Sequence, residues 1–174
     1  MKTWFNFLAA IMLTTLLFSC KKNDVAGNKN PAEVQRPDFA YGVKAANILD
    51  MVNQVRRSGC KCGDTDMPPV GELTWNDLLA QAAYWHSEDM KTNDFFDHAG
   101  SDKSKAGDRI KSAGYDWFAY GENIALGQPT ETVVMNSWLQ SEGHCKNIMN
   151  ANFKEMGIGR VDNYWTQEFA AKNK

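Results

Sequence analysis

The stretch Gly121-Glu122-Asn123-Ile124-Ala125 places one acidic side chain between a glycine and a short apolar run. A carboxylate beside residues of strand character is costly to bury unless it is paired or ligates something. A histidine stands on each side of this stretch, His98 before it and His144 after it. We therefore expect a folded domain to bring His98, Glu122 and His144 together in one cleft.

Length, composition and net charge limit the kinds of protein that this chain can be. The chain has 174 residues, of which 43% are hydrophobic and 11% aromatic, and its formal net charge is -2. This length predicts a single domain that buries about two thirds of its unfolded surface, around a core rich in large rings. The charged residues form no basic stripe, so we expect no nucleic-acid partner. We also expect a monomer.

Residues 1–19 have the pattern of a signal peptide. Lys2 precedes an apolar run from Phe7 to Phe18, which suits the hydrophobic region of such a peptide and is short for a membrane-spanning helix. The segment ends in Leu16-Leu17-Phe18-Ser19-Cys20, which resembles a bacterial lipobox. In a lipobox, signal peptidase II cuts before the cysteine, and the cysteine is acylated. An ordinary secretory signal with an incidental cysteine is the alternative.

Residues 20–38 are expected to form a lipid anchor and a flexible tether. Several acyl chains on Cys20 would hold the chain firmly at a membrane. The tether has almost no apolar periodicity, which is typical of a flexible segment. The residue after the cysteine is Lys21 and not an aspartate, and this favours the outer membrane in a cell that has one. The expected location is the cell envelope, at the outer membrane or cell surface, with residues 39–174 as the folded domain.

Three cysteines lie within the expected domain, at positions 60, 62 and 145. An exported protein meets an oxidising environment, so we expect one disulfide and one remaining thiol. Either Cys60 or Cys62 could pair with Cys145, and the spacing does not choose between them. The C-x-C pair lacks the spacer of a thioredoxin-like redox site. A metal site of three cysteines and one histidine is the alternative to the disulfide.

Hydrophobic periodicity predicts the helices and strands of the domain. Helices are expected over residues 41–57, 75–92, 104–113 and 130–141, with a short helical turn over 143–149 and connecting segments over 59–72 and 115–120. Thr74 and Thr130 are the expected N-caps of the second and fourth helices. An antiparallel hairpin is expected around Asp162-Asn163, with the stretch at Glu122 as a neighbouring strand. The sequence thus predicts an α+β domain in which helices flank a small antiparallel sheet.

Other polar side chains stand near the expected cleft. His98 follows two aromatic residues in a turn-rich loop, where functional side chains gather. His86 lies on the face of a predicted helix, and we expect it to be a hydrogen-bonded histidine of the core rather than a ligand. Arg109 is placed for an ion pair or for a hydrogen bond that stabilises a loop.

An ordered set of motifs along residues 41–170 resembles a known family. The motifs are Phe95-Phe96-Asp97-His98, Gly114-Tyr115, Gly121-Glu122-Asn123-Ile124-Ala125, Trp138-x-x-Ser141-x-Gly143-His144, Asn147-Ile148-Met149 and Tyr164-Trp165-x-Gln167-x-Phe169. They are similar to those of bacterial members of the CAP superfamily (cysteine-rich secretory proteins, antigen 5, pathogenesis-related 1; also called SCP-like). The resemblance implies a three-layer α-β-α sandwich with a small antiparallel sheet. It also implies a cleft with two histidines and two glutamates, where some members bind a divalent metal.

The resemblance carries over residue by residue. His98 matches the first family histidine and Glu122 the first family glutamate. Ser141 stands where the second glutamate would be, and Tyr164 stands where eukaryotic members have their other histidine. Bacterial members look as though they use His144 instead. The resemblance therefore implies a three-group site of His98, Glu122 and His144, with Tyr164 in the same cleft.

This set of residues supports several kinds of chemistry. Two imidazoles and one carboxylate suit zinc or another divalent cation, with water or substrate in the open position. Zinc-bound water would be a hydrolytic nucleophile, and without metal Glu122 is the candidate general base. A Ser141-His144-Glu122 triad can be written down, but no nucleophile elbow surrounds Ser141. A hydrogen-bonded network that only fixes loop geometry is the structural alternative.

The resemblance does not decide the activity, because lipid binding, peptide binding and proteolysis are all proposed for CAP proteins and fold does not decide function. We predict an exported, membrane-anchored CAP-domain lipoprotein. Its cleft binds a small-molecule, lipid or peptide ligand, either directly or through a divalent cation. The alternatives are a metal-dependent, peptidase-like hydrolase that acts on peptides or cell-envelope components, and a lipid-binding protein.

Overall fold

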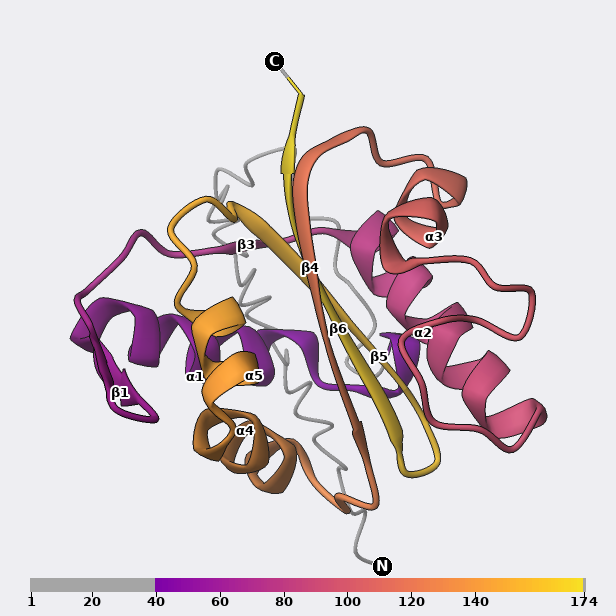
Figure 1. Cartoon of the computed structure of the whole chain (residues 1–174), viewed down its shortest axis with the longest axis horizontal. Coiled ribbons are helices and arrows are strands. Elements are labelled where there is room, and N and C mark those ends of the chain that lie inside the picture. Colours follow the sequence, from indigo (N-terminus) through magenta and orange to yellow (C-terminus); the bar gives the residue numbers. More distant parts are fainter. Residues whose placement is uncertain (1–39, 174) are drawn as a thin grey trace, which may run out of the picture. The chain divides into compact units, whose positions relative to one another are not determined.

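A four-stranded sheet runs through the middle of the domain (Figure 1). The computed structural model describes residues 40–173. The strands stand in the order β3 (Thr74–Trp75), β5 (Glu155–Val161), β6 (Tyr164–Lys172) and β4 (Trp117–Leu126). β5 and β6 form the hairpin expected around Asp162-Asn163, and β4 pairs antiparallel with β6. The short β3 runs parallel to β5. The sheet is therefore mixed at this edge, whereas the sequence predicted an antiparallel sheet.

Helices cover both faces of this sheet (Figure 1). On one face lie α1 (Ala45–Ser58), α4 (Glu131–Gln140) and α5 (Glu142–Ile148), and on the other lie α2 (Asp77–Thr92) and α3 (Ala106–Ser112). Strand side chains alternate between the two layers. Phe169 therefore packs in the core beneath α1, α4 and α5, while its neighbour Ala170 packs beneath α2 and α3. The predicted three-layer α-β-α sandwich is confirmed.

Two glycines of β5 bring α2 unusually close to the sheet. A Cβ atom at Gly157 would lie 2.0 Å from the backbone nitrogen of Ala80, and one at Gly159 would lie 2.1 Å from that of Tyr84. Both distances are far inside van der Waals contact, so only glycine fits at these positions. The close packing fixes the height of α2 above the sheet, and with it the position of His86 on that helix.

One of the two predicted N-caps needs correction. The N-cap of α2 is Asn76, whose side chain accepts from the N–H groups of Leu78 and Leu79, and Thr74 instead belongs to β3. Thr130 does cap α4, as predicted, by accepting from the N–H of Val133. The preference of small polar residues for the N-cap cannot by itself choose between candidates two residues apart.

The segments expected to be connections contain strands. Residues 59–72 include a small hairpin of β1 (Cys60–Cys62) and β2 (Thr65–Met67), which turns through Gly63 with a φ of 58°. Residues 115–120 are partly strand, because β4 begins at Trp117 and pairs with the end of β6. The residue pattern of one segment does not reveal the β1–β2 hairpin or the start of β4, because such short or half-exposed strands are stabilised by pairing with a partner strand.

The predictions for the N-terminal region lie outside the described residues. These are the signal peptide at 1–19, the acylated Cys20 and the tether at 20–38. Within residues 40–173, none of the helices combines the length and the apolar character needed to cross a membrane.

Candidate functional site

Glu122 is buried in β4, and both oxygens of its carboxylate have partners. Oε1 lies 2.6 Å from Nδ1 of His98, and Oε2 accepts a hydrogen bond of 2.6 Å from Arg109. Burial acts to raise the pKa of Glu122, but the hydrogen bond to His98 and the positive charge of Arg109 outweigh it, so the pKa is lowered. Glu122 is therefore an ionised, fully engaged carboxylate at neutral pH.

The glycine before Glu122 has a packing role. A Cβ atom at Gly121 would lie 2.7 Å from the ring of Phe153, which packs against the opposite face of β4. The ring of Phe153 in turn stacks on Phe169 of β6, with ring centroids 5.5 Å apart. Gly121 thus lets the aromatic core approach β4 directly behind the buried acid.

The loop between α2 and α3 presents His98 to Glu122. Arg109 donates to the backbone carbonyl of His98 at 3.1 Å, and His86 donates from Nε2 to the carbonyl of Asp97 at 2.9 Å. The hydrogen bond to Glu122 raises the pKa of His98. Because Nδ1 is held by Glu122, the ring turns its Nε2 atom to the cavity, where no described residue bonds to it.

His86 and Arg109 support this arrangement from the helices. His86 is fully buried, and burial lowers its pKa, so it is a neutral histidine of the core, as its place on the helix face predicts. Its Nε2 lies 3.9 Å from Oε2 of Glu122. Arg109 also donates to the carbonyl of Ser104, so one guanidinium ties α3, the loop and β4 together. Arg109 thus forms both the ion pair and the loop-stabilising hydrogen bond that the sequence offered as alternatives.

Glu168 is the residue that sequence reasoning missed. It lies directly opposite Glu122 in the β4–β6 register and is fully buried. Burial, then the negative charge of Glu122, raise the pKa of Glu168 well above its ordinary value. Neither of its oxygens has a hydrogen-bond partner within residues 40–173, so burial favours the neutral form of this acid. An acidic residue in the apolar end of a predicted strand was the signal that could have found it.

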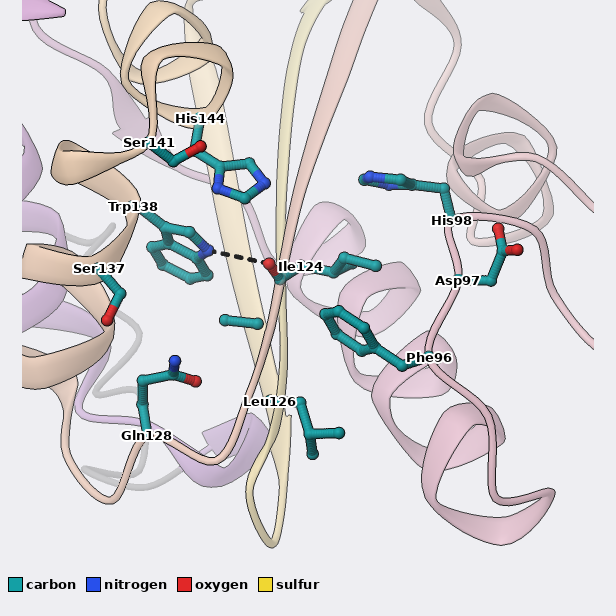
Figure 2. Close-up of a pocket in the computed structure, with 11 residues that line it drawn as sticks. Phe96, Asp97, His98, Ile124, Leu126, Gln128, Ser137, Trp138, Ser141 and His144 are labelled. Carbon is teal, nitrogen blue, oxygen red and sulfur yellow. Dashed lines mark hydrogen bonds between the residues drawn. The ribbon is translucent and has the colours of Figure 1, made fainter. Parts of the chain in front are cut away.

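His144 lies on α5, across the cavity from His98. Figure 2 shows the two imidazole rings projecting into the cavity from opposite sides of β4. The backbone carbonyl of His144 accepts from Asn123 at 3.2 Å, which ties α5 to the strand that carries Glu122. Burial, with a smaller effect of the charge on His98, lowers the pKa of His144. The pKa values of the two histidines are therefore shifted in opposite directions.

The cavity between these histidines has a volume of about 540 Å³. Its lining comes from three segments: the loop before α3, the end of β4, and α4 with the start of α5. The lining residues are Phe96, Asp97, His98, Ile124, Ala125, Leu126, Gln128, Ser137, Trp138, Ser141 and His144. Cavities of this size hold small molecules or short segments of a larger ligand.

The structure separates some residues that the sequence predicts to act together. Glu122 lies behind His98 and not in the cavity lining, and Tyr164 starts β6 opposite Leu126, also outside the lining. Ser141 lines the cavity between α4 and α5. No hydrogen bond joins Ser141, His144 and Glu122 in the part of the chain that the structure describes, and the oxygens of Glu122 are bonded elsewhere.

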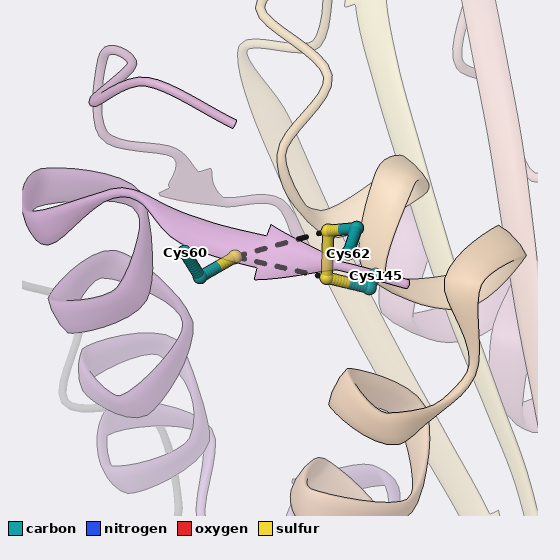
Figure 3. A group of neighbouring side chains, drawn as sticks. All are labelled: Cys60, Cys62 and Cys145. Atoms are coloured by element: carbon teal, nitrogen blue, oxygen red, sulfur yellow. Dashed lines mark hydrogen bonds between the residues drawn. A yellow bond between two sulfur atoms is a disulfide. The ribbon is translucent and has the colours of Figure 1, made fainter. Parts of the chain in front are cut away.

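The three cysteines gather where β1 meets α5 (Figure 3). Cys62 and Cys145 form the disulfide, and Cys60 is free, with its sulfur 3.8 Å from that of Cys62 and 3.7 Å from that of Cys145. The bridge holds β1 to α5, the helix that carries His144.

The geometry limits where a metal could bind. Within residues 40–173, Cys60, Cys62 and Cys145 are the one group of three ligands whose atoms all lie within 4.8 Å of one another, and two of them are joined in the disulfide. His98, Glu122 and His144 do not form so tight a group.

Known proteins share this domain. The family model described as "CAP: Cysteine-rich secretory protein family" matches residues 49–170. The "Uncharacterized protein YkwD" of Bacillus subtilis (strain 168) is 41% identical over 102 residues, which are 58% of this chain and 40% of that protein. An extracellular protein containing an SCP domain from Bacillus anthracis strain Ames is 32% identical, with a TM-score of 0.65 over 74% of this chain and 40% of that chain. This chain thus spans less than half the length of either relative.

A more distant structure shares the fold alone. NaASP2, crystallised with Zn2+, is 15% identical, with a TM-score of 0.52 over 76% of this chain and 82% of that chain. The family model, in contrast, covers most of the described domain, and it agrees with the motif order along the sequence. The chain belongs to the cysteine-rich secretory protein family, CAP, and carries the SCP domain found in bacterial extracellular proteins.

Proposed function

We propose that this protein is an exported, membrane-anchored CAP-domain lipoprotein whose cavity binds a ligand through a divalent cation held by His98 and His144. The observation that carries the proposal is the state of His98. One ring nitrogen is held by the buried carboxylate of Glu122, and the other is free at the cavity wall opposite His144. A carboxylate behind an imidazole is the usual support of a metal-ligating histidine, because it fixes the tautomer and the ring orientation.

The residues present fit a cation in part. Zinc in proteins takes four ligands, and imidazole nitrogen is among those it prefers. His98 and His144 would supply two of them, with water and the bound ligand in the remaining positions. Glu122 would orient His98 and not touch the cation, because His98 and Arg109 already occupy its oxygens. Since NaASP2 was crystallised with Zn2+, zinc is the first cation to test; when bound, it would polarise an oxygen of the ligand.

Calorimetric titration of Zn2+ into the metal-free protein is the direct test. We expect one ion per chain, and at least about tenfold weaker binding in His98→Ala and in His144→Ala. Cys60→Ser is the matched control, and its affinity should equal that of the wild type, because the free thiol lies outside the cavity. Equal affinity in the double variant His98→Ala/His144→Ala would refute the site. Zinc-dependent cleavage of peptides by the wild type would instead identify a hydrolase.

The membrane anchor rests on the lipobox-like sequence that ends in Cys20, and the SCP-domain relative from Bacillus anthracis is extracellular. We expect the wild type in the membrane fraction, with a mass that includes acyl chains. Cys20→Ala should appear in soluble fractions, because the acylated residue is gone. Cys60→Ser controls for the loss of a cysteine and should stay with the membrane. Membrane association of Cys20→Ala at the wild-type level would disprove the anchor.

A further inference from the structure

The edge of β4 that faces away from β6 is open along the cavity. β4 is the last strand in the sheet order β3-β5-β6-β4, so it pairs with β6 on one side only. No strand within residues 40–173 pairs with its other side. An edge of this kind presents unpaired backbone N–H and C=O groups to whatever approaches it.

Hydrogen bonds around β4 identify the residues whose backbone groups point outwards. The carbonyl of Glu122 accepts from an asparagine of α5 at 3.0 Å, and the carbonyl of Ile124 accepts from Trp138 at 3.3 Å. The N–H of Gly127, in contrast, points towards the hairpin of β6 and donates to Asn163. Because backbone direction alternates along an antiparallel strand, the even-numbered residues of this part of β4 face outwards.

Three outward-facing backbone groups at the cavity are therefore left without a hydrogen-bond partner among residues 40–173. They are the N–H of Ile124 and both the N–H and the C=O of Leu126, and none of them bonds to another group in the described chain. Both residues line the cavity. A ligand that displaces water from this edge must offer partners to these groups, since burying an N–H or C=O without a partner is costly.

The walls of the cavity suit side chains that point alternately to two sides. In Figure 2, Ser137 and Trp138 stand on one side of β4, and Phe96 and His98 stand on the other. Phe96 is 48% exposed and Leu126 is 42% exposed, so apolar surface is uncovered next to the free edge. Neither lysine nor arginine is among the residues that line the cavity, which disfavours a polyanion as the occupant.

We infer that the ligand of the cavity is an extended peptide segment that adds to β4 as a further strand. This inference rests on the proposed function, because it names the class of ligand for the same cavity. The peptide would bond to the N–H and C=O of Leu126 and to the N–H of Ile124. Main-chain bonds then supply affinity, and the two walls select alternate side chains. Beyond Ile124 such a strand passes between His98 and His144 (Figure 2).

The first test uses a library of N-acetylated, C-amidated heptapeptides, selected on the purified full-length protein. The tightest peptide is then resynthesised with one N-methyl group at each backbone position in turn. Positions that face β4 should bind about tenfold more weakly, because the methyl group removes a donor and pushes the strands apart, whereas the positions between them should change little. A uniform effect along the peptide, or no peptide that binds, would overturn the inference.

The second test changes the edge itself. Leu126→Pro removes the outward N–H without removing a bond to β6, and proline is tolerated on an edge strand. Leu126→Ala is its matched control, because it shortens the same side chain but keeps the N–H. We expect the proline variant to bind the selected peptide about fivefold to tenfold more weakly than the alanine variant, since one hydrogen bond contributes about 1 kcal/mol. Equal affinities would count against strand addition.

The proposed cation at His98 and His144 and the proposed strand addition to β4 can each be refuted without refuting the other. Peptide binding that keeps its alternating N-methyl pattern in EDTA and in His98→Ala leaves strand addition standing and removes the cation. Zinc binding at His98 and His144 without any selected peptide does the reverse. If no peptide binds but oleate shifts the amide resonances of Ile124 and Leu126, the ligand is a lipid and the peptide inference falls.

Discussion

Replacing Glu122 by alanine is expected to lower the free energy of unfolding by about 3–5 kcal/mol, because it leaves the buried charge of Arg109 without its counter-ion. Arg109 is only 8% exposed, and without Glu122 it keeps backbone carbonyls alone as partners. His98 would also lose the contact that fixes its ring. Urea denaturation followed by tryptophan fluorescence measures the change, with the slope of the transition checked for constancy.

A second arginine–glutamate pair in the same chain provides the control. Arg57 donates to Glu72 at 2.7 Å, a contact of nearly the same length as that between Arg109 and Glu122. Both side chains of this pair are about half exposed, so solvent screens the interaction. Glu72→Ala should therefore lower the free energy of unfolding far less than Glu122→Ala does. Equal losses in the two variants would show that burial does not set the strength of the Glu122 contact.

The cost of Glu122→Ala should depend on pH. The lowered pKa of Glu122 contributes stability above its ordinary value of 4.5, and this stability is lost as pH falls through the folded-state pKa. The raised pKa of His98 contributes stability below its ordinary value of 6.5, which is lost as pH rises through the folded-state pKa. The charge of Glu122 also helps to keep Glu168 protonated, which works against stability as pH rises. The difference between wild type and variant should therefore be largest between about pH 4.5 and 6.5.

Removing both Cys60 and Cys62 should cost about 4 kcal/mol, whereas removing Cys62 alone should cost much less. The disulfide spans 83 residues, and in the chain-entropy model a bridge of this span stabilises by roughly that amount. In Cys62→Ser, the sulfur of Cys60 remains 3.7 Å from that of Cys145, and a disulfide needs them at about 2.0 Å. A small shift of β1 would therefore allow Cys60 to replace Cys62.

Urea unfolding of Cys62→Ser, Cys60→Ser and the double serine variant, each with and without a thiol reductant, measures these costs. Peptide mass mapping identifies which cysteines are bridged. Cys60→Ser should match the wild type, because its thiol is free. A loss in Cys62→Ser as large as that in the double variant, with no bridge between Cys60 and Cys145, would show that β1 cannot shift far enough.

The pairing of Cys62 rather than Cys60 illustrates what residue spacing leaves undetermined. Two residues apart on one strand, their side chains share a face, and both reach Cys145. Only the depth of β1 against α5 distinguishes them, since Cys62 is fully buried and Cys60 is not. That depth depends on packing between segments far apart in the chain.

Local chemistry made much of the domain predictable from the sequence alone. The period of apolar residues in α1, the Thr130 cap of α4 and the turn at Asp162-Asn163 each depend on neighbouring residues only. The order of the motifs identified the family, and the buried acid at Glu122 pointed to a partner. His98 was correctly expected as its neighbour, on the strength of those motifs.

The tertiary structure alone decided the rest of the site around Glu122. The register of β4 on β6 places Glu168 opposite Glu122, and the register results from pairing along the whole strand. Arg109 reaches the same carboxylate from α3, so Glu122 orients His98 and stands behind the cavity. The sequence alone determined that an acid at position 122 needs partners, because burial of an unpaired carboxylate is costly. Which partners it has depends on non-local packing, and no spacing along the chain encodes that.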